Sequence, residues 1–314
     1  MKNPVNIDSV VINGEVCTGC ALCVDVCPHR LLALKKEKAV FDNGQDQDCM
    51  ECGHCAAICP LEAVSVEGVS AILDFQTFPE KLKVLKPEEC DCSSLVQLMR
   101  SRRSCRKYTS QPVETALLED LVKIGITAPS GTNSQSWDFV ILPTRADVEA
   151  LGNLTADFYR KLNSQAANPL YRLLAKFFAN DALNRYYQNY YQSVAEALRE
   201  WDEDGVDRLF HGATAAIVVT GRKDASCPAE DALLATQNIL LAAHTMGLGS
   251  CLIGFAVEAV KRSTSARAAL AMAGNEEIYS VIALGYPAVT FRQVAGRKEV
   301  QPRVLHLAGG TLVR

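Results

Sequence analysis

The 314-residue sequence lacks the features of a secreted, membrane-spanning or nucleic-acid-binding protein. Its opening, MKNPVNIDSVVING, contains no apolar run of signal-peptide length, and no later stretch has the apolar length that a membrane span needs. Lys and Arg number 32 against 36 Asp and Glu, so no positive excess points to nucleic acid or anionic lipid. A clear G-x-G-x-x-G fingerprint of a Rossmann domain is also missing, which argues weakly against NAD(P)H. We therefore expect a cytoplasmic protein without nucleic-acid or membrane partners.

Cysteine, by contrast, is abundant: the chain has 13, and eight of them fall between positions 17 and 59. Residues 17–28 read CTGCALCVDVCP and residues 49–60 read CMECGHCAAICP, a repeat of C-x2-C-x2-C-x3-C-P. Such regular, clustered cysteines in a reducing compartment favour metal over disulfides. Three thiolates at this spacing converge on one cubane cluster, and the fourth ligates the opposite cluster in two-cluster ferredoxins. The alternative, zinc, uses paired C-x2-C motifs instead.

The repeat resembles that of bacterial-type two-cluster ferredoxins over about residues 7–68, and it predicts two [4Fe–4S] clusters. Segments 39–41 and 63–66 are similar to the short strands that flank the clusters in that fold. We assign residues 1–68 to this ferredoxin domain. Its ligands are expected in two sets: Cys17, Cys20, Cys23 and Cys59 for one cluster, and Cys49, Cys52, Cys55 and Cys27 for the other.

Residues 69–92 show no clear periodicity and contain two prolines with mixed charges, which indicates a loosely packed linker. Cys90 and Cys92 end it as C-x-C, which without a partner pair is more typical of free thiols than of a metal site. The same interpretation applies to Cys105, Cys227 and Cys251.

A second domain is predicted from residue 93 to 314. Ser94 is a candidate N-cap for a helix that runs into the basic segment 100–108, RSRRSCRKY. This segment suits either a solvated basic face or a phosphate site. A helix over 114–127, a polar turn and an apolar strand at 139–142 follow.

Two of these motifs, RRSCRKY at 102–108 and APSGTNSQSW at 128–137, together resemble the FMN-dependent nitroreductase family. The likeness continues through a strand at 213–220, a long helix at 231–246 and a last core strand at 278–287. The chain departs from well-known members at Cys251-Leu252-Ile253-Gly254, where they have Pro-Ile-Glu-Gly. It also has Ser136 where they have proline.

The resemblance implies an FMN site between two intertwined subunits of a homodimer. The residues that would grip the phosphate and ribityl chain are Arg102, Arg103, Ser104, Arg106 and Arg297. Those that would lie along the flavin from the partner subunit are Pro129, Ser130, Gly131, Thr132, Asn133 and Gln135. Those that would line the isoalloxazine, with N–H groups near its N5 edge, are Leu252, Ile253 and Gly254.

Residues 155–205 form a long, aromatic-rich insert, predicted as two helices that act as packing elements or as a lid over the flavin. Among its aromatics, residues 186–191 are candidates to face a planar substrate. His211 is expected to make a structural hydrogen bond rather than to transfer protons. Asp231 is interpreted as a surface helix carboxylate, with a place near the polar edge of the flavin as the alternative.

The fold class is therefore α+β: a small ferredoxin-like domain followed by a mixed sheet covered by helices. We expect a low-potential external donor to reduce the clusters, which reduce FMN, which in turn reduces a nitroaromatic or quinone acceptor. The donor would be ferredoxin-like or NAD(P)H, and no catalytic side chain is required. Two alternatives are an electron-transfer or storage protein that docks a redox partner, and an FMN dehydrogenase that exports electrons through the clusters.

Overall fold

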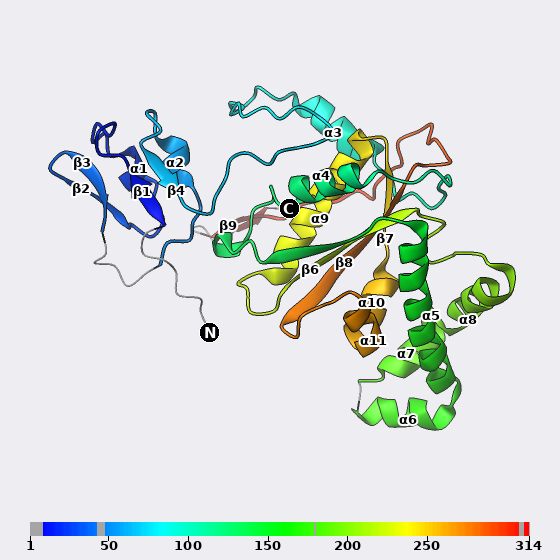
Figure 1. Cartoon of the computed structure of the whole chain (residues 1–314). Coiled ribbons are helices and arrows are strands. Elements are labelled where there is room, and N and C mark those ends of the chain that lie inside the picture. Colours follow the sequence, from blue (N-terminus) through cyan, green and yellow to red (C-terminus); the bar gives the residue numbers. More distant parts are fainter. Residues whose placement is uncertain (1–8, 43–47, 179, 308–310, 314) are drawn as a thin grey trace.

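The computed structural model describes residues 9–42, 48–178, 180–307 and 311–313. A small Cys-rich domain and a larger α/β domain are joined by an extended segment (Figure 1). In the small domain, β1 (Val10–Ile12) pairs with β4 (Val64–Val66), and β2 (Leu32–Lys35) pairs with β3 (Lys38–Phe41), both antiparallel. The predicted strands at 39–41 and 63–66 thus correspond to β3 and β4.

The core of the small domain is partly made of the cysteines themselves. Cys17, Cys23 and Cys55 are buried in the same cluster as Leu32 and Val64. The two helices, α1 (Leu22–Asp25) and α2 (His54–Ile58), are each about one turn long. A domain this small buries little apolar surface, so bound clusters would supply much of its stability.

The linker is not loose along its whole length, because its middle is fixed to α4 (Thr115–Gly125). The fully buried Asp120 accepts hydrogen bonds from the Gln76 N–H at 3.0 Å and from the Thr77 N–H and hydroxyl at 2.7 and 2.6 Å. Lys123 donates to the Asp74 carbonyl. The expectation of loose packing is therefore wrong for residues 74–77, whereas residues 81–89 are exposed.

The attachment at Asp120 predicts a pH-dependent release of the linker. Burial raises the pKa of this carboxyl, but the hydrogen bonds from Thr77 and Gln76 outweigh it and hold the pKa below its ordinary value. Since the folded-state pKa lies below the unfolded value of about 3.9, the stabilisation is complete above that pH and is lost as pH falls through the folded pKa. Asp120→Asn should lower the opening free energy of the Gln76 and Thr77 amides by about 1.5–3 kcal/mol at pH 7, measured by hydrogen exchange.

The matched control for this prediction is Glu119→Gln, since the neighbouring Glu119 contacts only the Gln76 side chain among the linker residues. Exchange at the two amides should stay unchanged in that variant. Equal exchange in wild type and Asp120→Asn would contradict the attachment.

The large domain is built on a four-stranded sheet in the order β5-β6-β8-β7. Its strands are Trp137–Leu142 (β5), Ala215–Arg222 (β6), Gly249–Leu252 (β7) and Glu276–Gly285 (β8). Neighbouring strands are antiparallel, and one parallel bridge joins Ser104 to Ser250. The α+β expectation is confirmed.

Helices cover both faces of this sheet (Figure 1). Side chains alternate along a strand, so Ile217 of β6 packs with α4 and α9 (Pro228–Thr245), whereas Val218 packs on the other side. That other side is covered by α5 (Arg145–Ala167), α10 (Gly254–Arg262) and α11 (Thr264–Ala269). Burial on both faces explains the continuous apolar run of β6.

Two local predictions need correction. The first helix of the domain, α3 (Cys92–Ser101), is capped by Asp91, whose carboxylate accepts from the Ser93 and Ser94 N–H groups, so Ser94 is not the cap. The insert is not two helices. It contains the end of α5, then α6 (Pro169–Phe178), α7 (Ala182–Asn189) and α8 (Tyr191–Arg199), and a π-helical turn at 200–204.

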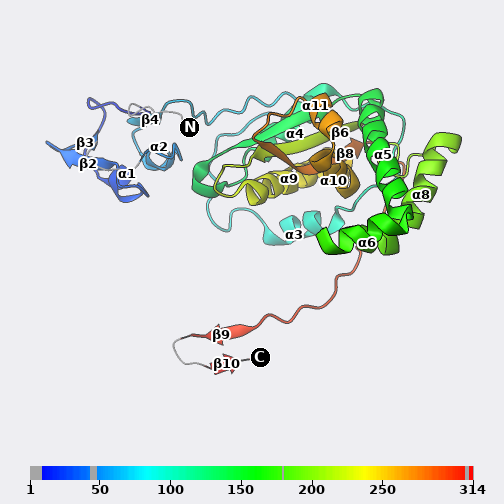
Figure 2. The same ribbon diagram turned by 90° about the horizontal axis from the view of Figure 1, so that it is seen from below.

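The C-terminal arm, residues 287–307 and 311–313, leaves the sheet as an extended segment, and its β9 (Val304–His306) pairs antiparallel with β10 (Thr311–Val313). Figure 2 shows this arm standing away from the rest of the chain. It exposes several large apolar side chains: Val289, Phe291, Val294, Val300, Val304, Leu305 and Leu307. In the described part of the chain, no helix has the length and apolarity to cross a membrane.

Candidate functional site

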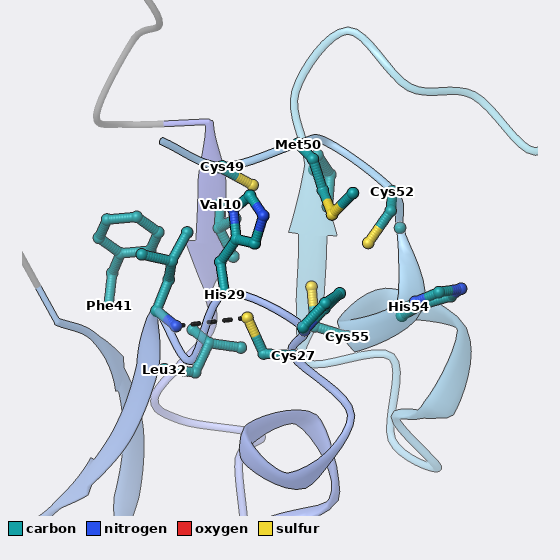
Figure 3. A pocket seen from close by; sticks show the side chains of 14 residues that line it. Val10, Cys27, His29, Leu32, Phe41, Cys49, Met50, Cys52, His54 and Cys55 are labelled. Atoms are coloured by element: carbon teal, nitrogen blue, oxygen red, sulfur yellow. Dashed lines mark hydrogen bonds between the residues drawn. The ribbon is translucent and has the colours of Figure 1, made fainter. Parts of the chain in front are cut away.

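The second cysteine set surrounds one cavity of the small domain. Cys49, Cys52 and Cys55 come from the second repeat, and Cys27 joins them from the end of the first (Figure 3). Met50 and His54 also line this cavity. The fold therefore places the fourth cysteine of the first repeat beside the first three of the second repeat, as the predicted ligand sets require.

The first set lines a separate cavity in the same crossed manner, with Cys59 beside Cys17, Cys20 and Cys23. Among the described residues, no three His, Cys, Asp or Glu side chains are placed to hold one metal ion. Thiolates around a [4Fe–4S] cube each bind a different iron and lie further apart than ligands of a single ion. Both cavities thus fit a cluster.

Backbone N–H groups point at several of these sulfurs. The Gly19 and Ala39 N–H groups lie 3.4 and 3.5 Å from Cys17 Sγ, and the hydrogen bonds from Ala39 and Gly19 lower the pKa of that thiol. Cys27, Cys49 and Cys59 each accept one N–H in the same way. At Gly19, with φ +70°, a Cβ would lie 2.1 Å from the Glu37 carbonyl oxygen, so only glycine fits. Such bonds stabilise thiolate charge and help to set a cluster's potential.

In the large domain, arginines gather without carboxylate partners. Burial lowers the pKa of Arg102, and the charges of Arg103 and Arg297 lower it further. Within the described ranges, neither these three nor Arg106 forms an ion pair, although 14 ion pairs occur elsewhere. Unpaired guanidinium groups that repel one another form a site suited to an anion such as phosphate.

The basic segment lies directly against β7. Ser104 bridges Ser250, and the Cys105 N–H donates to the Ser250 carbonyl at 2.9 Å. This places the arginines beside the end of β7, where Leu252, the last residue of the strand, is 48% exposed and faces the large cavity. The expectation of a free N–H at Ile253 is wrong, because that N–H donates to the Val281 carbonyl at 2.9 Å and the side chain is in the core.

A large cavity extends from Arg106 and residues 252–254 to the insert helices. Tyr186 and Tyr190 line it, and their rings lie 6.2 Å apart. The Tyr186 hydroxyl donates to Asn163 at 2.7 Å, and burial raises its pKa to about 12. Tyr187 instead packs on Tyr191 and under Arg172. Of the candidate aromatics at 186–191, the structure therefore brings only Tyr186 and Tyr190 to the cavity.

His211 lies at the same cavity. Burial lowers its pKa, the charge of Asp207 raises it, and Arg106 lowers it again. Its ring makes no hydrogen bond to any residue that the structure describes, so the predicted structural hydrogen bond is not found.

The loop at 129–135 is held by a buried carboxylate. Asp231, at the start of α9, is only 3% exposed and accepts the Gly131 N–H at 2.9 Å and the Ser134 hydroxyl at 3.1 Å. The interpretation of Asp231 as a surface carboxylate is therefore wrong. A Cβ on Gly131 would lie 2.6 Å from Ser226 Oγ, so this turn needs glycine.

The structure does not bring this loop together with the arginine cluster. The loop precedes β5 at one edge of the sheet, whereas residues 252–254 lie at the end of β7 at the other edge, with β6 and β8 between them. Three strand spacings place the two edges roughly 14 Å apart. Within one chain, the loop does not line the cavity that holds Arg106 and Leu252.

Asn133 in this loop has a contact that the sequence did not indicate. Its side-chain N–H2 donates to the carbonyls of Met50 and Glu51, at 3.0 and 3.1 Å. Both acceptors lie between Cys49 and Cys52, two of the predicted ligands. No motif signals a hydrogen bond between an amide and two backbone carbonyls some 80 residues away.

Known proteins match both parts of the chain. Residues 99–286 match the profile of the Nitroreductase family, and residues 7–63 match that of a 4Fe-4S dicluster domain. An NADH dehydrogenase of Thermus thermophilus is 30% identical over 188 residues, covering 60% of this chain and 83% of the relative. An Archaeoglobus fulgidus protein, whose name pairs NADH dehydrogenase with NAD(P)H nitroreductase, is 25% identical over 200 residues, covering 64% and 86%. A solved Desulfitobacterium hafniense nitroreductase with bound FMN is 20% identical, with a TM-score of 0.46 and coverage of 66% and 97%.

Proposed function

Because the chain belongs to the nitroreductase family and carries a 4Fe-4S dicluster domain, we propose that it links one-electron and two-electron chemistry. In this proposal a low-potential donor supplies electrons through two [4Fe–4S] clusters and FMN to a small acceptor such as a nitroaromatic or a quinone. The observation that carries it is the presence, in one chain, of two four-cysteine cavities and an unpaired arginine cluster beside a large cavity. Its cysteine content suits the reducing cytoplasm.

The residues of the large domain fit FMN. Arg102, Arg103, Arg106 and Arg297, with Ser104, would hold the phosphate, and Leu252 with Gly254 would border the ring. When bound, FMN accepts electrons singly or in pairs and can pass a hydride to the acceptor. In this proposal the acceptor lies in the cavity against Tyr186 and Tyr190, which orient it.

A second copy of the chain would complete the site. Residues 129–135 lie at the opposite sheet edge from the arginine cluster, so one flavin can meet both only if the loop comes from a partner. Apolar surface for such a partner is present: α3 exposes Leu95, Val96 and Met99, and the C-terminal arm exposes more. We propose a homodimer with FMN at the interface.

The names of the two relatives favour one alternative, in which NADH is oxidised at FMN and electrons leave through the clusters. Anaerobic turnover distinguishes the possibilities. With a nitroaromatic or a quinone as acceptor, we expect the loaded protein to turn over with reduced ferredoxin and to stay at background with NADH. Turnover with NADH accompanied by cluster reduction would support the reversed flow. Flavin reduction without turnover, whichever the donor, would identify an electron carrier.

A further inference from the structure

We propose that the cluster site formed by Cys27, Cys49, Cys52 and Cys55 is the one that exchanges electrons with the flavin, and that Asn133 positions it. This inference rests on the proposed function. It adds the path that the electrons take and the residue that positions the cluster site next to the flavin. The same inference makes the site of Cys17, Cys20, Cys23 and Cys59 the outer one, where the external donor delivers its electrons.

The contact lies at the ligand loop itself. Asn133 binds the carbonyls of Met50 and Glu51, the two residues between ligands Cys49 and Cys52. Met50 also lines the cavity that these cysteines surround (Figure 3). Among the described residues, these are the only hydrogen bonds that join the Cys-rich domain to the domain beyond residue 92.

The backbone conformation on both sides of this contact favours the two hydrogen bonds. Glu51 has a left-handed backbone, φ +51°, which aims its N–H at Cys49 Sγ, 3.4 Å away, and its carbonyl at Asn133. Asn133 is itself left-handed, with φ +52°, a conformation that asparagine tolerates better than most residues. A chain of hydrogen bonds thus runs from the buried Asp231 through the 131–134 turn to Asn133, Glu51 and Cys49.

The contact also changes the role expected for Asn133. Its amide nitrogen already donates to two carbonyls, so only its side-chain oxygen is left to accept a bond from a flavin. The residue belongs to the loop of proposed flavin contacts, and it binds the two residues that separate Cys49 from Cys52.

The other cysteine set has no comparable attachment. Within the described ranges, no hydrogen bond links residues 17–23 or Cys59 to the large domain, and Cys20 is exposed. An exposed ligand suits docking of an external protein donor. For each two-electron reduction, two molecules of a one-electron donor are oxidised, two electrons pass in turn through the outer and inner sites, and the protons come from water.

The test of the positioning role is Asn133→Asp, which keeps the side-chain oxygen and the shape but replaces both donors by a carboxylate facing two carbonyls. Loss of two hydrogen bonds should shift the docked population roughly tenfold. We expect faster amide hydrogen exchange at Glu51 and Cys52 and slower flavin bleaching by reduced ferredoxin, by about the same factor. FMN content is measured in each variant so that the bleaching rate is compared per bound flavin, and light-driven reduction, which bypasses the clusters, gives the reference rate.

Asn238→Asp is the matched control, because its amide donates to Thr127 within the large domain and does not touch the Cys-rich domain. Unchanged exchange in Asn133→Asp, or equal effects in both variants, would overturn the role of Asn133. If reduced ferredoxin fails to reduce the flavin even in wild type, the proposed function is wrong. The hydrogen-exchange data then still show whether Asn133 holds the loop of Met50 and Glu51.

The identity of the inner site has a separate readout. A [4Fe–4S] cluster in its reduced, +1 state is paramagnetic and broadens nearby amide signals in nitrogen-15 NMR spectra, so the spectra are recorded on the reduced protein. Thr132 and Asn133 should be broadened in wild type and in Cys20→Ala, and should sharpen in Cys52→Ala. Sharpening in Cys20→Ala instead would make the site of Cys17, Cys20, Cys23 and Cys59 the inner one.

Discussion

Replacing Cys52 with alanine will reduce ferredoxin-driven bleaching of the flavin to background and leave FMN bound. Cys52 is one of the thiols around the cavity of the second set, and no other described cysteine outside that set lines this cavity. Loss of a ligand exposes the cluster and removes stabilisation from a domain whose core is partly cysteine. We expect about half the iron per chain and an unchanged FMN content.

The control for this effect is Cys92→Ala. Cys92 is exposed at the first position of α3, outside both cavities. It should keep wild-type iron content and wild-type bleaching. Wild-type bleaching in Cys52→Ala with its iron halved would show that electrons reach the flavin without the second site.

Replacing Arg102 and Arg103 together with alanine will weaken FMN binding by a large factor. Each hydrogen bond from a cation to a phosphate contributes about 1.5–3 kcal/mol, so the pair should cost about 3–6 kcal/mol. That loss corresponds to a dissociation constant raised by roughly two to four orders of magnitude. Quenching of flavin fluorescence during titration of the flavin-free protein measures it.

The arginine prediction has a second consequence. Without a ligand, the charges of Arg103 and Arg297 disfavour the charged form of Arg102, so the double variant should not unfold more easily than flavin-free wild type. Arg100→Ala changes an exposed position in the last turn of α3, just before this pair, and should bind FMN normally. An unchanged dissociation constant in the double variant would move the phosphate site elsewhere.

Sequence reasoning succeeds here where spacing encodes geometry. The C-x2-C-x2-C-x3-C-P repeat brings the sulfurs of Cys49, Cys52 and Cys55 together locally, and the crossed position of Cys27 follows from the same pattern. The apolar segment around Val218 reads as a strand, and the structure confirms the strand and buries it on both faces.

Sequence reasoning fails where a polar side chain is satisfied by a distant partner. Asp231 reads as a surface helix carboxylate and no motif singles out Asp120, yet both are buried and accept backbone N–H groups from another segment. Asn133 reads as a flavin contact, yet its donors are used by a loop of the other domain. Such hydrogen bonds depend on how segments distant in the sequence pack together, and no local pattern in the sequence predicts them.

The most direct test of the account is the order of reduction after anaerobic mixing of the cluster- and FMN-loaded protein with reduced ferredoxin, followed by stopped flow at cluster and flavin wavelengths. The account predicts that the clusters bleach first and the flavin follows, and that NADH alone bleaches neither on that timescale. Fast bleaching of the flavin by NADH, with the clusters reduced afterwards, would contradict it and make the clusters the exit.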